Sequence, residues 1–188
     1  MWAGLLADTL RHALLALGAL ALACLVGGPF GLLAASRGWA RSPILGVAAL
    51  GRTLPSIAVL ALLVPLLGVG IAPAIAALTL LALPPIVINV DLAIRSTPAA
   101  ALDVARGLGM SPQQRFTRVV VPLALPVALA GVRTASVEVI GSATLATFVG
   151  AGGLGDDIVR GLQTGDSRLL LIASAIVAAM ALATEIRR

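Results

Sequence analysis

The sequence predicts an all-α fold, a polytopic membrane helical bundle with about five transmembrane helices, formed as one domain over residues 1–188. Of these residues, 60% are hydrophobic and 11% are charged, whereas about a quarter of the residues in a soluble domain are charged. The mean hydropathy is +1.09. Apolar runs of about 20 residues, the length that crosses a bilayer, recur along the chain. Little of the chain remains for a large soluble domain.

The first two spans come from the N-terminal third of the chain. One apolar run covers residues 13–35. A second covers residues 44–67 but is divided by Arg52 and Pro55, and a charge and a proline both disfavour an unbroken span. We therefore expect residues 53–67 to cross the membrane and the preceding part to lie at the interface.

The remaining spans are expected over residues 74–94, 123–149 and 168–186. The third span contains Pro84 and Pro85, and two consecutive prolines predict a local break in its helix. The Gly-rich stretch between the fourth and fifth spans is expected to be a loop. A search for internal repeats finds none that is convincing, which counts against a secondary transporter built from inverted halves.

Residues 95–121 form the most polar extended segment and read as two short helices. The sequence at 96–98, Ser-Thr-Pro, supplies a cap residue and a proline at the first helical position, and Gly109 follows the end of that helix. Ser111 then precedes Gln114 by three residues, the spacing of a capping box. We expect Pro122 to close the pair.

The distribution of arginine predicts the orientation. All thirteen basic residues are arginine, and nine of them fall on one side of the expected spans against three on the other, where four aspartates also gather. The positive-inside rule then places the N-terminus outside and both the 95–121 segment and the C-terminus in the cytoplasm. The basic side holds Arg37, Arg41, Arg52, Arg95, Arg106, Arg115, Arg118, Arg187 and Arg188.

The composition disfavours several function classes. The chain has one histidine, one cysteine and no dense set of carboxylates, so we expect no metal site and no enzymatic activity. The arginines are scattered and not interleaved with aromatic residues, which disfavours nucleic-acid binding. The 95–121 segment, rich in Ala and Gly, is either a solvated connecting loop or a docking element for a soluble partner.

Residues 103–122 resemble the EAA loop of permeases in bacterial binding-protein-dependent ABC importers. That pattern is Glu-Ala-Ala, three residues, Gly, nine residues, then Ile-x-Leu-Pro. The residues that occupy its specified positions are Asp103, Val104, Ala105, Gly109, Val119, Val121 and Pro122. Val104 is the one departure that is not conservative, and we expect it to change the docking geometry slightly.

Flanking segments look like the osmoprotectant branch of these permeases, which carries glycine betaine, choline or carnitine. The segments are residues 53–56, 65–68, 123–126, 130–135 and 148–155. A related importer for another small solute, of the methionine or aliphatic sulfonate type, is the alternative. Few aromatic side chains are available to enclose a quaternary ammonium group, so we expect high-affinity recognition to belong to a separate binding protein.

The resemblance implies a multi-pass protein of the bacterial inner membrane whose cytoplasmic hairpin contacts ABC ATPase subunits. A Walker A loop requires lysine, and the chain has none, so ATP and Mg²⁺ are expected on the partner ATPase, with no cofactor in this chain. A second permease copy, as a homodimer, an extracytoplasmic substrate-binding protein and membrane lipid complete the expected partners. The expected coupling residues are Asp103, Val104, Ala105, Arg106, Gly107, Gly109, Val119, Val121 and Pro122.

Charged residues inside the expected spans are the remaining candidates. Arg133 and Glu138 fall within the fourth span, where ionised groups are costly and usually face a cavity or another protein. We expect them either to line the translocation pathway or its gate, or to form a structural pair or contacts at an interface between permeases. Asp91 precedes Arg95 by four residues, which favours an ion pair within one helix.

Overall fold

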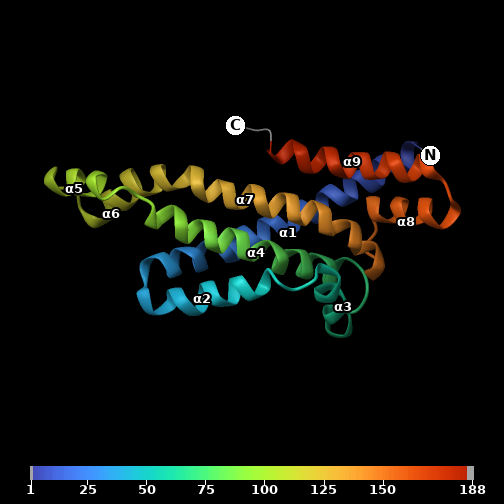
Figure 1. The fold of residues 1–188 in the computed structure, drawn as a ribbon, viewed down its shortest axis with the longest axis horizontal. Helices are drawn as coiled ribbons and strands as arrows, with labels where there is room; N and C mark the ends of the chain where they lie inside the picture. Colours follow the sequence, from blue (N-terminus) through green and yellow to red (C-terminus); the bar gives the residue numbers. More distant parts are fainter. Residues whose placement is uncertain (1, 186–188) are drawn as a thin grey trace.

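The computed structural model describes residues 2–185, and these residues form helices with no strand among them (Figure 1). The longer helices are α1 (Trp2–Ser36), α4 (Ile71–Arg95), α7 (Val121–Ala143) and α9 (Ser167–Glu185). The shorter ones are α2 (Gly38–Gly51), α3 (Ser56–Leu67), α5 (Ala99–Gly107), α6 (Pro112–Arg115) and α8 (Leu154–Thr164). A π-helical turn, η1 (Phe116–Val120), precedes α7, and a 3-10 helix, η2 (Thr144–Val149), follows it.

The expected polytopic bundle is confirmed. Within the described residues, four helices are long and apolar enough to cross a membrane, or five if the bent pair α2 and α3 is one span. The turn between α1 and α2, the C-terminal end of α4 and the α5–α6 hairpin lie at one end of the bundle, which we call the hairpin end (Figure 1). The start of α1, α3 and α8 lie at the opposite end, and α9 runs back from there. Arg187 and Arg188 lie outside the described residues.

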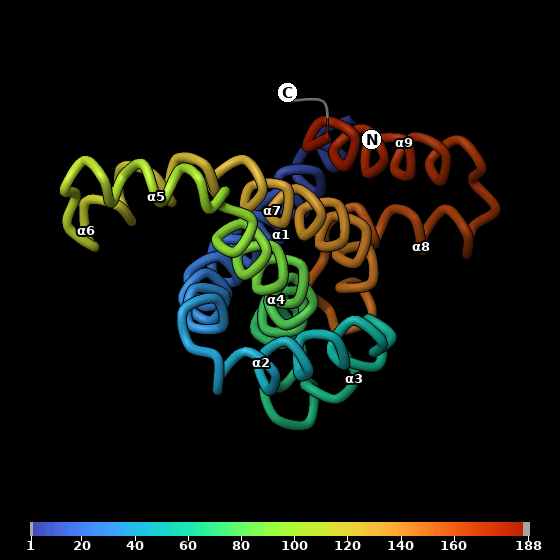
Figure 2. The backbone as a smooth tube through the Cα atoms, turned by 60° about the vertical axis from the view of Figure 1, so that its left-hand side comes forward, coloured from blue at the N-terminus to red at the C-terminus, as the bar shows by residue number. Residues whose placement is uncertain are grey.

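The second span differs from the expectation. Helices α2 and α3 meet at 100°, and α2 packs beside α1 and α4, whereas α3 turns across the bundle to contact α4 and η2 (Figure 2). The division into an interfacial lead-in and a span over residues 53–67 is therefore wrong, because the lead-in is itself a bundle helix. Pro55 explains the bend, since it donates no backbone N–H and keeps Leu54 out of the helical region.

The predicted break in the third span is also wrong, because α4 runs without interruption through Pro84 and Pro85. Both prolines are buried, and α1 and α7 both pack along α4. The side-chain Nδ2 of Asn89 donates a 2.8 Å hydrogen bond to the carbonyl of Pro85. Neighbouring helices thus hold a proline-containing helix in a continuous form, as is common in membrane bundles.

Glycine allows the central helices to approach closely. A Cβ atom added to Gly31 of α1 would lie 2.6 Å from Cβ of Val90 in α4. One added to Gly131 of α7 would lie 2.5 Å from Cβ of Asn89, on the other flank of α4. Small residues at such crossings allow the dense packing on which association of membrane helices depends. The core therefore sits around α4, where α1 and α7 pack against it.

Helix α8 occupies part of the stretch that the sequence analysis treated as a Gly-rich loop. It begins after Gly153, whose φ is 94°, and carries Asp156 and Asp157 in its first turn. Carboxylates at that position interact favourably with the helix dipole. The helix packs against α9, α1 and η2, and so closes the opposite end of the bundle.

Candidate functional site

The hairpin at residues 95–121 is the most prominent projection from the bundle (Figure 2). Pro98 is the N-cap residue of α5, so the predicted start is off by one residue, and no side chain caps that end. Pro122 does not close the hairpin as expected. Helix α6 passes through η1 into α7 without a break. The helix widens to the π form just before Pro122, whose ring would crowd the carbonyl four residues earlier in an α-helical turn.

A Schellman motif ends α5. The N–H of Met110 donates to the carbonyl of Ala105 at 3.1 Å, and the N–H of Gly109 donates to the carbonyl of Arg106 at 2.9 Å. Gly109 has a φ of 72°, the left-handed conformation that this motif requires and that glycine adopts without strain. The glycine of the predicted motif is thus accounted for by the local backbone.

The predicted capping box starts α6. The Oγ of Ser111 accepts a hydrogen bond from the N–H of Gln114 at 3.3 Å. The N–H of Ser111 donates to Oε1 of Gln114 at 2.9 Å. The two reciprocal bonds fix the geometry of the turn between α5 and α6.

The outer surface of the hairpin carries unpartnered apolar side chains. Val104 is 64% exposed and Leu108 is 70% exposed, and their spacing of four residues places them on one face of α5. Asp103 and Arg106 form an exposed ion pair at 2.7 Å on the same helix. Ala105 is buried, and α5 packs against α6 and η1, the second half of the hairpin.

The other residues predicted in this motif are distributed along the hairpin. No heavy atom would lie within 4 Å of a Cβ added to Gly107, so its surroundings are open. Val119 is half-buried in η1, and Val121 and Pro122 are exposed at the start of α7. The structure therefore presents most of the predicted residues on one projecting element.

The charged residues of α7 face away from the core. Arg133 and Thr134 are exposed on α7, which belongs to a helical stretch apolar enough to cross a membrane. Glu138 lies one turn after Thr134 and is half-buried. Glu138 lies within electrostatic reach of Arg52, which caps the C-terminal end of α2 at the bend before α3. Arg133 and Glu138 do not pair with each other among the salt bridges of the described residues.

Asp91 pairs with Arg41 of α2, so the predicted ion pair with Arg95 is wrong. Nε and one Nη of Arg41 donate three hydrogen bonds of 3.2–3.3 Å to the Asp91 carboxylate. The side chain of Asp91 is 4% exposed, and Arg95 is exposed at the end of α4. A spacing of four residues permits an in-helix pair, but Asp91 points into the bundle, where its cation partner among residues 2–185 is Arg41 of α2.

A polar cluster at the opposite end escaped the sequence analysis. The side chain of Asp157 in α8 is 4% exposed, and its Oδ1 accepts a 3.3 Å hydrogen bond from Arg160. Burial raises the pKa of Asp157, and the neighbouring carboxylate of Asp8 on α1 raises it further. The side chain of Asp156 accepts a hydrogen bond from Thr147 of η2. The sequence signal for this cluster is the pair of adjacent aspartates, Asp156 and Asp157, after a glycine-rich turn.

His12 ties the same end of α1 to α7. It is fully buried, and its Nε2 lies 3.0 Å from the carbonyl of Ile140. Gly153 packs against it, since a Cβ added there would lie 3.3 Å from Cβ of His12. His12 is therefore a packed contact between helices.

A family model described as "Binding-protein-dependent transport system inner membrane component" matches residues 27–186. The chain belongs to this family. The resemblance inferred from the EAA-type loop is thereby confirmed, and the protein is a membrane-spanning subunit of a transport system that works with a binding protein. Membership implies ATPase and binding-protein partners.

Two relatives show how similar this permease is to characterised transport proteins. It is 39% identical over 189 residues to the osmoprotectant import permease protein OsmW of Salmonella typhimurium, covering 97% of this chain and 88% of the relative. It is 42% identical over 159 residues to the choline transport system permease protein OpuBB of Bacillus subtilis, covering 85% of this chain and 73% of the relative.

The fold matches that of a solved permease. The structure of the MetNI methionine ABC transporter in an inward-facing conformation aligns with a TM-score of 0.81, at 22% sequence identity, over 96% of this chain and 91% of that chain. This likeness establishes the permease fold of the helical bundle and its projecting hairpin.

Proposed function

We propose that this permease forms the translocation pathway of an ATP-driven importer for a small osmoprotectant such as glycine betaine, choline or carnitine. The observation that carries this proposal is the 39–42% identity to permeases of osmoprotectant and choline transport over most of the chain. Similarity to a methionine transporter is limited to the fold, so the methionine and sulfonate alternatives have less support.

The hairpin is proposed as the contact with the ATPase, which would bind ATP and Mg²⁺ and carry out the hydrolysis. Its support is the exposed apolar pair Val104 and Leu108 on a helix that projects from the bundle. Exposed apolar side chains on a projecting element are typical of a docking surface. The open space at Gly107 would allow the backbone of a partner to approach.

Arg133 and Glu138 are proposed to lie on the translocation pathway, at the face where a second permease subunit packs. An arginine that faced lipid at this depth would be costly, so protein or a water-filled passage is expected to cover this face of α7. The carboxyl group of Glu138 in α7 lies within electrostatic reach of the guanidinium of Arg52, the C-cap residue of α2 before the bend to α3. A movement of α3 would change the distance between these two side chains. The second subunit is proposed to be another copy of the chain.

The proposed orientation places the hairpin end in the cytoplasm and the N-terminus outside. Arg37, Arg41 and Arg95 gather at the hairpin end, as the positive-inside rule requires of the cytoplasmic side. Helix α8 and its aspartates then face the extracytoplasmic binding protein.

Copurification with the cognate ATPase tests the coupling role. Leu108→Glu places a charge on the hairpin, and Leu162→Glu is a matched control because Leu162 is 64% exposed on α8 at the opposite end. We expect the wild type and Leu162→Glu to retain the ATPase. Leu108→Glu is expected to retain at least tenfold less ATPase than the wild type. Equal retention by all three proteins would contradict the assignment of the hairpin.

ATP-dependent uptake into proteoliposomes tests the substrate. The complete transporter, with its binding protein, is expected to accumulate radiolabelled glycine betaine, choline or carnitine, and not methionine or an aliphatic sulfonate. Uptake that persists without ATP would contradict the importer class, and uptake of methionine alone would contradict the substrate class.

A further inference from the structure

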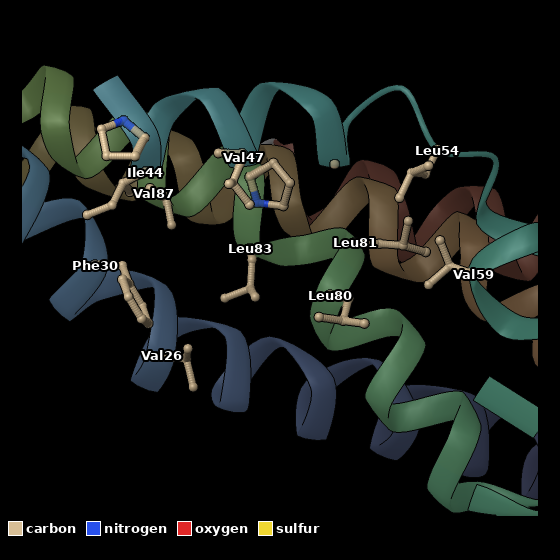
Figure 3. Close-up of a pocket in the computed structure, with 14 residues that line it drawn as sticks. Val26, Phe30, Ile44, Val47, Leu54, Val59, Leu80, Leu81, Leu83 and Val87 are labelled. Atoms are coloured by element: carbon tan, nitrogen blue, oxygen red, sulfur yellow. The ribbon is translucent and has the colours of Figure 1, made fainter. Parts of the chain in front are cut away.

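An apolar groove lies between α1, α2 and α4 on the surface of the chain (Figure 3). Its volume is about 460 Å³. In Figure 3 the side chains of α1 and α2 face each other across the groove, and α4 forms its floor. The principal lining residues are Val26, Phe30, Ile44, Val47, Leu83 and Val87. Several are substantially exposed, including Val47 at 71% and Phe30 at 49%, so no part of the described chain fills the groove.

The groove ends at the Arg41–Asp91 ion pair. Ile44 lies three residues after Arg41 on α2, and Val87 lies four residues before Asp91 on α4. These spacings keep each lining residue on the same helix face as its charged neighbour. The apolar walls therefore lead directly to a polar mouth at the hairpin end of the bundle.

The mouth carries an excess of positive charge. The ion pair neutralises Asp91, but the side chain of Arg41 remains 43% exposed. Arg37 and Arg95 are exposed at the same end, and neither takes part in a salt bridge within residues 2–185. Trp39, 76% exposed one residue after the start of α2, is typical of the membrane–water interface.

The dimensions of the groove fit a lipid chain. Leu80 and Val87 both line it, and seven residues of helix correspond to about 10 Å of length. That is most of the roughly 15 Å thickness of one hydrocarbon leaflet. An acyl chain lying along α4 would thus bring its headgroup to the level of the arginines.

We propose that this groove binds an anionic phospholipid, with one acyl chain between α1, α2 and α4 and the headgroup at Arg37 and Arg95. Basic pockets between transmembrane helices at the cytoplasmic side commonly bind anionic headgroups. The assignment to the inner leaflet rests on the proposed orientation, whereas the groove and its basic mouth do not.

A second copy of the chain fits this groove poorly. The proposed second subunit packs on a different face, that of Arg133 and Glu138 in α7, and a two-fold axis beside the groove would bring Arg37, Arg41 and Arg95 of both copies close together. An anionic lipid neutralises the same arginines and fills the apolar space. Charge complementarity therefore favours the lipid.

Native mass spectrometry of the purified full-length chain tests the proposal. The protein is exchanged into mild detergent and offered dioleoyl phosphatidylglycerol and dioleoyl phosphatidylcholine in equal amounts. We expect the wild type to retain phosphatidylglycerol preferentially. Arg37→Gln and Arg95→Gln are each expected to lower this preference about fivefold, the factor expected for one basic residue at an anionic surface. Arg168→Gln, an exposed arginine at the other end, is the control.

A second variant tests the groove itself. Ala48 is buried in the groove wall at 8% exposure, and Ala48→Phe is expected to fill the space and lower the retention of both lipids. Leu171→Phe on the exposed face of α9 is its control. The arginine variants leave the core intact, so the test stands even if Ala48→Phe does not fold.

Three outcomes would overturn the proposal. One is equal retention of the two lipids by the wild type, and another is an unchanged preference in the arginine variants. The third is a loss of dimer in Ala48→Phe with unchanged lipid retention, which would assign the groove to a second copy. Since no ATPase or substrate is present, failure here is distinct from failure of the proposed transport function.

Discussion

The carboxylate of Asp91 in α4 accepts three hydrogen bonds from the guanidinium of Arg41 in α2, and so joins two helices whose charged residues lie fifty positions apart. Because Asp91 is 4% exposed, removing its cation leaves a buried charge without compensation. We expect Arg41→Gln to lower the free energy of unfolding by about 2 kcal/mol, less than for a fully dry pair because Arg41 is partly exposed.

The matching change on the acid side is expected to be milder. Asp91→Asn keeps a hydrogen-bond acceptor and leaves a guanidinium that can reach water, so the expected loss is about 1 kcal/mol. Unfolding by sodium dodecyl sulfate in mixed micelles, followed by circular dichroism, measures both variants. An equal decrease in the free energy of unfolding for Arg41→Gln and Asp91→Asn would contradict this prediction.

Gly131 and Gly141 provide a matched comparison within α7. A Cβ at Gly131 would lie 2.8 Å from the carbonyl oxygen of Pro85, whereas nothing lies within 4 Å of one at Gly141. We expect Gly131→Ala to destabilise the isolated chain by about 1–3 kcal/mol through overpacking. Gly141→Ala is expected to stabilise it by up to about 1 kcal/mol through its better helix propensity. The same unfolding assay measures both, and a neutral Gly131→Ala would refute the close approach of α4 and α7.

Asp157 predicts a pH dependence of stability. Burial and the charge of Asp8 raise the pKa of its carboxyl above the ordinary value of 3.8. The folded state therefore holds this proton more tightly than the unfolded state does. The contribution of the Asp157 carboxyl to the free energy of unfolding is therefore greatest below pH 3.8. It is lost as the pH rises through the pKa of the folded state.

Asp157→Asn is expected to remove that dependence and to stabilise the chain at neutral pH. The measurement is the thermal midpoint of the wild type and the variant between pH 3.5 and 8. Asp166→Asn, on an exposed aspartate, is the control. The prediction fails if the stability of the wild type relative to Asp157→Asn rises with pH.

The Schellman motif predicts different effects at two neighbouring glycines. Gly109 has a φ of 72°, so Gly109→Ala strains the end of α5 by about 1 kcal/mol. Gly107 is helical and unhindered, and its alanine variant is expected to be neutral or stabilising. Trypsin cleavage after the exposed Arg106 reports local opening, and we expect it to be about fivefold faster in Gly109→Ala. Equal rates in the two variants would show that the left-handed turn is not required.

The sequence predicted well those features that depend on local patterns. The apolar runs located the spans because lipid selects for continuous hydrophobicity, and Ser111 with Gln114 located the start of α6 because a capping box is satisfied within four residues. The EAA-type spacing identified the hairpin, but Pro122 did not end it, because a π turn accommodates the ring.

The errors share one cause, which is that tertiary contacts are absent from local patterns. Pro84 and Pro85 predicted a break that packing by α1 and α7 prevents. Asp91 found its partner on another helix instead of four residues away. The 100° bend between α2 and α3 could not be inferred from the apolar run, since hydrophobicity gives the length of a segment and not its direction.

The close approach of α4 and α7 at Gly131 has a mechanical consequence. The hairpin connects the ends of these two helices, and their backbones are too tightly packed to slide past one another. A force applied at the hairpin would therefore move α4, α7 and the hairpin as one rigid arm. With 25 residues in α4, this arm is about 37 Å long, so a small tilt at one end becomes a displacement of several ångströms at η2 and α8.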